Sequence, residues 1–165
     1  MKIIQNFLIG IFLLVFSNNV YCAESNIVVQ NMTTTQDSIY GTIYSGNFNL
    51  PTEIDSLTDI IFAEICFNAD IVLPDSNTTI QTGFFALNLD GSANINYVSS
   101  NIYSLKKNGV VNFDITEFVD LWKNGDILNN GFLVRKKHSD SNLLNTSFVN
   151  FPSGNIAKIR IIYSE

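Results

Sequence analysis

Residues 61–71 read IFAEICFNADI, and this segment decides the fold class of the chain. Apolar side chains occupy every second position, and Glu64, Asn68 and Asp70 lie between them. Such alternation is typical of a β-strand with one face in a core, because successive side chains of a strand point to opposite faces. The segment therefore predicts a half-buried strand that ends before Pro74.

Shorter patterns of the same kind recur along the rest of the chain. Phe85, Leu87 and Leu89 alternate up to Asp90-Gly91, a dipeptide typical of the tight turn of a β-hairpin. Further strands are predicted at 27–30, 38–44, 95–97, 110–115, 132–136, 144–151 and 157–163. About eight or nine short strands at regular spacing predict an all-β chain, folded as an antiparallel two-sheet β-sandwich of the jelly-roll or Greek-key type.

One segment has helical spacing instead. Thr116 can cap a helix, Phe118 and Trp122 then recur at helical intervals, and Gly125 can end the helix in a left-handed conformation. The pattern predicts one short helix near residues 116–124 that covers an end or an edge of the sandwich. Trp122 is expected to be its buried anchor.

The first 22 residues have the composition of a signal peptide. Lys2 precedes an apolar run at 3–16 that is short for a membrane span of about 20 residues. We expect cleavage after Cys22, which leaves residues 23–165 as a single β-sandwich domain that is secreted, periplasmic or on the cell surface. No membrane span is then left. An uncleaved anchor and a lipid on Cys22 are the alternatives.

Loss of Cys22 would leave Cys66 as the one thiol of the mature chain. Its place in an apolar strand pattern predicts a buried thiol, and a bridge between two chains is the alternative. The domain would then have no internal disulfide and would depend on its core for stability.

Charge and composition exclude several classes of function. The formal net charge of -6 argues against a nucleic-acid partner, because neutralising phosphates needs a basic surface. One His and two Cys give little material for a zinc site or for a nucleophile paired with a histidine. We therefore predict no metal, no cofactor and no catalytic residues. His138 has no partner in a known motif, and the basic run 135–137 is predicted to be a solvated strand end.

A second motif lies around the predicted helix. Phe113-Asp114-Ile115-Thr116 is followed by a set of spaced residues, namely Val119, Trp122, Gly125, Asn129 and Gly131. This stretch resembles the Asp-Val-Thr, Val, Trp, Gly, Asn-x-Gly signature of the DNRLRE domains. Those are secreted β-sandwich modules, some of them classed with carbohydrate-binding modules. The arm domain of transforming-growth-factor-β propeptides carries a similar stretch.

The chemistry of this motif favours a structural role. Asp114 and Thr116 offer acceptors to the backbone donors at a helix start, Trp122 can bury a large ring, and glycines permit turns. We therefore interpret six residues as a structural signature: Asp114, Thr116, Trp122, Gly125, Asn129 and Gly131.

Candidate ligand-binding residues are the tyrosines near strand ends. Tyr40, Tyr44, Tyr97 and Tyr103 could stack on the apolar faces of sugar rings, with Asn amides bonding to hydroxyl groups. Packing in the core or at its rim is the alternative for each. The segment 88–94 faintly resembles a calcium loop, but it holds a single carboxylate and is predicted to be a hairpin turn.

These observations lead to three hypotheses. The first is a secreted, non-catalytic β-sandwich module that binds an extracellular glycan or a partner surface. The second is a purely structural subunit or spacer of a cell-surface assembly. The third is a polysaccharide-active enzyme. An exposed line of aromatic rings would favour the first, an exposed apolar sheet edge the second, and two carboxylates across a cleft the third.

Overall fold

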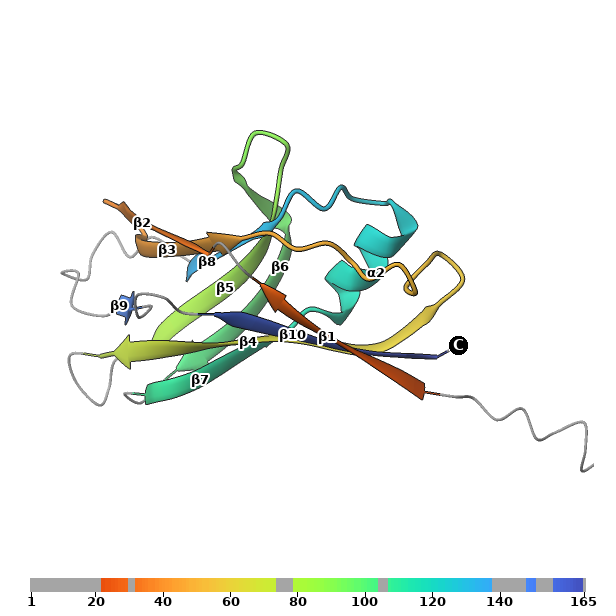
Figure 1. The fold of residues 1–165 in the computed structure, drawn as a ribbon. Helices are drawn as coiled ribbons and strands as arrows, with labels where there is room; N and C mark the ends of the chain where they lie inside the picture. The colour runs from red at the N-terminus through yellow and green to blue at the C-terminus, as the bar shows by residue number, and fades with distance from the viewer. Residues whose placement is uncertain are drawn as a thin grey trace, which may run out of the picture.

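The computed structural model describes residues 22–29, 32–73, 79–103, 107–137, 148–150 and 156–164. These segments form two antiparallel β-sheets, packed face to face, and one helix, α2 (Thr116–Asn124), at one end of the sandwich (Figure 1). The predicted antiparallel two-sheet sandwich with a helix at 116–124 is therefore confirmed. Residues 1–21 of the expected signal peptide and His138 lie outside the described residues.

The two sheets have five strands each within the described segments. Sheet A contains, in order, β1 (Cys22–Val29), β10 (Ala157–Ser164), β4 (Asp59–Val72) and β7 (Lys107–Asp114), with β9 (Phe148–Asn150) also paired to β4. Sheet B contains, in order, β2 (Thr33–Asp37), β3 (Gly41–Gly46), β8 (Phe132–Lys136), β5 (Ile80–Leu87) and β6 (Ala93–Tyr103). No described helix is long and apolar enough to cross a membrane.

The strand pairs are nested around the β5–β6 turn. Outward from this turn, β5 pairs with β6 in sheet B, β4 with β7 in sheet A, β3 with β8 in sheet B, and β1 with β10 in sheet A. The chain is thus one long hairpin, rolled so that successive pairs alternate between the sheets. This arrangement is a jelly roll.

The turn at the centre of this hairpin is the one predicted from Asp90-Gly91. Gly91 has a φ of 79°, and its N–H donates to the Asn88 carbonyl at 3.0 Å. The Asp90 carboxylate accepts hydrogen bonds from the N–H and the hydroxyl of Ser92. Side chains of this segment therefore close a turn, as predicted.

The core lies between the sheets and follows the alternation of the central strands. In β4 the buried residues are Ala63, Ile65, Phe67, Ala69 and Ile71. Ile61 continues the pattern but is 50% exposed at the end of the strand. Aromatic rings fill the middle of the core, where Phe84 stacks on Phe132 at a centroid distance of 4.9 Å.

The alternation predicted for β5 is wrong. Phe84 and Ala86 belong to the core, whereas Phe85 is buried on the opposite face of sheet B, and Leu89 lies in the turn with 83% of its surface exposed. The cause is that β5 is buried on both faces. The guanidinium carbon of Arg135 lies 4.5 Å from the Phe85 ring centroid and covers it.

Two further predictions are corrected by the side-chain positions. Cys66 is half-buried on the outer face of sheet A beside Glu64, because the odd-numbered residues of β4 face the core. Desolvation and the neighbouring Glu64 raise the pKa of the Cys66 thiol. The basic run at 135–137 is not a solvated strand end, since Arg135 and Lys136 are both buried.

Candidate functional site

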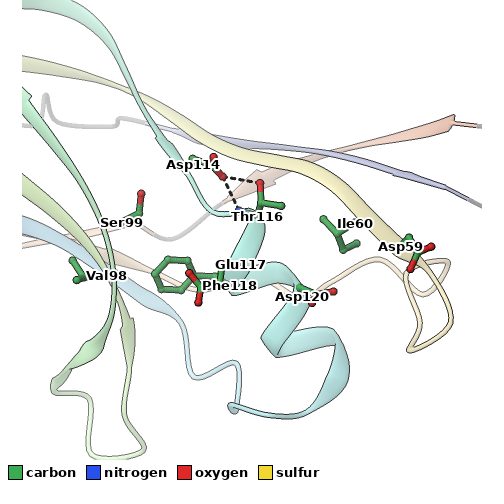
Figure 2. Close-up of a pocket in the computed structure, with 9 residues that line it drawn as sticks. All are labelled: Asp59, Ile60, Val98, Ser99, Asp114, Thr116, Glu117, Phe118 and Asp120. Carbon is green, nitrogen blue, oxygen red and sulfur yellow. Dashed lines mark hydrogen bonds between the residues drawn. The ribbon is translucent and has the colours of Figure 1, made fainter.

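A groove lies where α2 begins, between the ends of β4 and β7 and the middle of β6. We call it the helix groove, and it has a volume of about 750 Å³. It is lined by Asp59, Ile60, Val98, Ser99, Asp114, Thr116, Glu117, Phe118 and Asp120 (Figure 2). Strands from both sheets and the helix contribute, so the groove forms only when the sandwich closes.

The start of α2 is fixed by a short hydrogen-bond network. The Asp114 carboxylate accepts the N–H of Thr116 at 3.0 Å and its hydroxyl at 2.6 Å. The Thr116 hydroxyl oxygen in turn accepts the N–H of Ala63 in β4 at 2.9 Å. Thr116 is the first residue of the helix rather than its cap, and Asp114 supplies the acceptor. These hydrogen bonds connect the start of α2 to β4, which lies inside sheet A.

The opposite side of the helix is tied to the loop before β4. Lys123 is almost fully buried, donates to the Thr58 carbonyl, and lies 3.1 Å from an Asp120 carboxylate oxygen. The N–H of Leu57, the hydroxyl and N–H of Thr58, and the charge of Lys123 hold the pKa of Asp55 in this loop below its usual value. The loop and the helix thus form one unit beside the groove.

The lining of the helix groove is acidic. Among the described residues it contains four carboxylates, from Asp59, Asp114, Glu117 and Asp120, and no lysine or arginine. The Asp114 carboxylate is hydrogen-bonded to Thr116, and the Asp120 carboxylate is paired with Lys123. Asp59 and Glu117 are exposed, and their carboxylates have no hydrogen bond or ion pair with the described residues. The groove therefore presents hydrogen-bond acceptors and negative charge beside the apolar side chains of Ile60 and Val98.

The carboxylates are spread around the groove. Figure 2 shows Asp59 at the end of β4 and Asp120 one helical turn after Glu117, with Asp114 bonded back to Thr116. Within the described residues no group of three His, Cys, Asp or Glu side chains could hold a metal ion. The arrangement suits a ligand that donates hydrogen bonds along a surface.

A second, smaller cavity lies beside β2 and the end of β3. This polar pocket, of about 320 Å³, is lined by Thr33, Ser45, Gly46, Asn47, Leu87 and Asn130. The hydroxyl oxygens of Thr33 and Ser45 are 2.7 Å apart and hydrogen-bond to each other. The pocket is neutral, and its hydroxyl groups are already partly satisfied.

The structure does not bring together the three candidate tyrosines whose side chains it describes. Tyr44 is 2% exposed, lies in the core with its ring 5.5 Å from that of Phe67, and burial raises its pKa to about 12. It is not available for stacking, because β3 lies inside sheet B and Tyr44 is on its inner face. Tyr103 has a side chain outside the described residues.

The other two tyrosines lie on opposite faces of sheet B. Tyr40 is half-buried between β2 and β3, where its ring centroid lies 3.5 Å from the guanidinium carbon of Arg135. Tyr97 is half-buried and packs against the core. No aromatic ring is exposed among the side chains that the structure describes.

The six residues of the signature connect α2 and the following loop to the strands. Gly125 has a φ of 76° at the end of α2. The Asn129 amide donates to the Phe48 carbonyl at 2.8 Å, and its oxygen accepts the N–H of Gly131. Gly131 has a φ of 101°, and a Cβ there would lie 2.6 Å from the Gly46 carbonyl oxygen.

Trp122 anchors the helix as expected. Its ring is 6% exposed and meets the edges of Phe48 and Phe118 at centroid distances of 5.5 and 5.7 Å. The buried indole N–H has no hydrogen-bond partner among the residues that the structure describes. The ring therefore stabilises the helix by packing alone, and the prediction that Trp122 is buried is confirmed.

The sequence did not lead us to predict the acidic groove. Asp59, Glu117 and Asp120 were not among the candidate ligand-binding residues. A signal was present, because residues 114, 117 and 120 recur every three positions and so fall on one side of a helix start. Asp59 begins β4, which is distant in sequence from α2, so no spacing pattern indicated that it lies beside the helix.

Comparisons with known proteins add little to this description. No family model matches the chain, and no curated protein matches it. Among solved structures, a match is to a chain of tomato aspermy virus, with 13% identity, a TM-score of 0.36, and coverage of 98% of this chain and 93% of that chain. A TM-score at this level supports no conclusion about family or function, so the resemblance to DNRLRE domains stays a prediction.

Proposed function

We propose that this chain is an exported, non-catalytic β-sandwich module whose helix groove binds an extracellular glycan that is neutral or carries amino groups. The observation that supports this is the lining of the groove, where four carboxylates lie beside apolar side chains and no cation is present. Sugar hydroxyl and ammonium groups donate hydrogen bonds to carboxylates, and the apolar faces of sugar rings can contact Ile60 and Val98.

The same lining selects against anionic glycans. A uronate or sulfate group would meet like charges from Asp59 and Glu117, both of them exposed at the groove. The proposal thereby narrows the ligand class by charge. It also replaces aromatic stacking by hydrogen-bond acceptors as the basis of recognition, because no aromatic ring among the described side chains is fully exposed.

Catalysis is the weaker proposal for this groove. Hydrolysis of a glycosidic bond needs two carboxyl groups facing each other across the bond. Here Asp114 is occupied by the helix start and Asp120 by Lys123. The other two carboxylates come from different elements, since Asp59 begins β4 and Glu117 lies in the first turn of α2.

Isothermal titration calorimetry tests the proposal with three probes: neutral oligosaccharides, chitosan oligosaccharides and polygalacturonate oligosaccharides. We expect binding of a neutral or an amino probe and none of the uronate. Asp59→Ala and Glu117→Ala should each weaken binding by about tenfold, as for a charge-assisted hydrogen bond. Asn47→Ala in the polar pocket is the matched control and should bind like the parent.

Three outcomes would reject the proposal. They are binding of the uronate probe alone, binding of no probe, and loss of affinity in Asn47→Ala with the two groove variants unchanged. Salt separates the two ligand types, since affinity for chitosan should fall with ionic strength and affinity for a neutral glycan should not. N-terminal sequencing of the exported protein, expected to begin near Ala23, tests export separately.

A further inference from the structure

The four outer strands of the two sheets are protected to very different degrees. An exposed edge strand presents unpaired backbone groups, and monomeric proteins shield such edges with short strands, bulges, charges or covering segments. In sheet B, β2 has five residues, all polar, and β6 pairs with β5 through a register shift. The edge strand β7 of sheet A contains Lys107, and the Asn101 amide of β6 donates to the carbonyl of its Asn112.

The remaining edge strand, β1, has only one of these protections, a single charged side chain. It pairs with β10 over eight residues without a register shift, from Cys22 opposite Ser164 to Val29 opposite Ala157. Its sequence, CAESNIVV, contains no proline, lysine or arginine. Glu24 is its one charge, and the Arg160 guanidinium on β10 lies 3.1 Å from the Glu24 carboxylate and neutralises it.

Within the described residues, no strand pairs with the other side of β1. The strand runs beside β10 at the edge of sheet A (Figure 1). Its outward side chains, Glu24, Asn26 and Val28, are all exposed. A regular, nearly uncharged edge of this length is a template for another strand.

We propose that two copies of this chain associate by antiparallel pairing of β1 with β1, which joins the two A sheets into one. The sequence of β1 fits this occupant. Directly opposite residues of an antiparallel pair lie on the same face. With Asn26 opposite Asn26, Glu24 meets Val28 on the outer face, and Ser25 meets Ile27 on the inner face. No like charges then lie opposite each other.

This register has two further consequences. It uses residues 23–29, so it does not depend on whether Cys22 is retained. It also leaves the helix groove open in both copies, because β10 lies between β1 and the groove residues of β4, Asp59 and Ile60, and the rest of the groove lies beyond β4. The dimer would present two grooves, and its formation does not depend on what the groove binds.

Sedimentation equilibrium of the purified exported protein tests the association. We expect a monomer–dimer equilibrium with a dissociation constant of about 1–100 μM, since a single strand ladder buries a small interface. Asn26→Lys and Asn26→Asp should each be monomeric, because two like charges would face each other across the two-fold axis. An equimolar mixture of the two variants should dimerise again.

Two controls keep the test independent of folding. Asn112→Lys places the same charge on the outer face of β7 and should dimerise like the parent. Thermal unfolding should show that all variants are folded, as expected for an exposed position. Hydrogen exchange gives a second readout, in which the amides of 23–29 should become more protected as protein concentration rises.

The proposal is overturned if the parent sediments as a monomer at millimolar concentration. It is also overturned if both Asn26 variants dimerise like the parent, or if the mixture of the two stays monomeric. A parent that is monomeric but pairs β1 with a strand of a different protein would likewise contradict it.

Discussion

The helix α2 and the tip of the β5–β6 hairpin are held in place in two different ways. At the hairpin tip, the side-chain bonds of Asn88, Asp90 and Ser92 join residues two to four positions apart. Around α2, the hydrogen bonds join residues 53, 65 and 81 positions apart. The tip is therefore a local structure, whereas the helix is coupled to the closure of the whole sandwich. Substitutions at the two places should differ accordingly.

The largest effect is expected at Trp122. Trp122→Ala removes a ring that contacts Phe48 and Phe118, and it should lower the free energy of unfolding by about 3–5 kcal/mol. Urea denaturation measures the change. Trp122→Phe is the control. It keeps a ring and removes an indole N–H that has no hydrogen-bond partner in the described part of the chain, so its loss should be under about 2 kcal/mol. Equal urea midpoints for parent and Trp122→Ala would refute the anchor role.

The second effect concerns the link between α2 and sheet A. Thr116→Val replaces the hydroxyl that accepts the Ala63 N–H and donates to Asp114. A buried backbone donor loses its acceptor, so we expect a loss of about 1–3 kcal/mol. Thr116→Ser keeps the hydroxyl and should stay within about 0.5–1 kcal/mol of the parent. If the valine and serine variants unfold at the same urea concentration, the bond to Ala63 contributes nothing.

The contrast between these two regions also shows what the sequence could predict. The Asp90-Gly91 turn and the helix ending at Gly125 were both predicted, because a positive φ and helical spacing are local properties. The partners of Lys123 and Asn129 were not predicted, since Thr58 and Phe48 are brought near them only by the rolled hairpin. Phe85 was assigned to the wrong face because its cover, Arg135, comes from another strand.

The candidate site was harder to predict than the fold for the same reason. Tyr44 was chosen from its place near a strand end, but strand order places β3 between β2 and β8 and buries this ring. The helix groove combines the start of β4, the end of β7, the start of α2 and the middle of β6. Such a site depends on topology, and a chain without family matches gives no topology in advance.

A smaller effect is expected in acid from the loop that contacts α2. The N–H of Leu57, the hydroxyl of Thr58 and the charge of Lys123 hold the pKa of Asp55 below its usual 3.8. The unfolded chain therefore takes up this proton at a higher pH than the folded chain does. The stabilisation is complete above about pH 4 and is lost as the pH falls through the lower, folded value.

Urea unfolding between pH 6 and pH 2.5 measures this dependence. Asp55→Asn should lose stability less steeply in acid than the parent, because it no longer carries the group that titrates. An unchanged slope in Asp55→Asn would show that this carboxylate does not contribute.

The smallest effect is expected at the hairpin tip. Leu89 is 83% exposed, and the bonds that close its turn run between Asn88, Asp90 and Ser92. Leu89→Ala removes a side chain that is already in water, so the free energy of unfolding should change by less than about 0.5 kcal/mol. The same substitution at Leu73, which is 2% exposed, should cost about 2–5 kcal/mol. A loss of more than about 1 kcal/mol in Leu89→Ala would mean that the tip is coupled to the sandwich as α2 is.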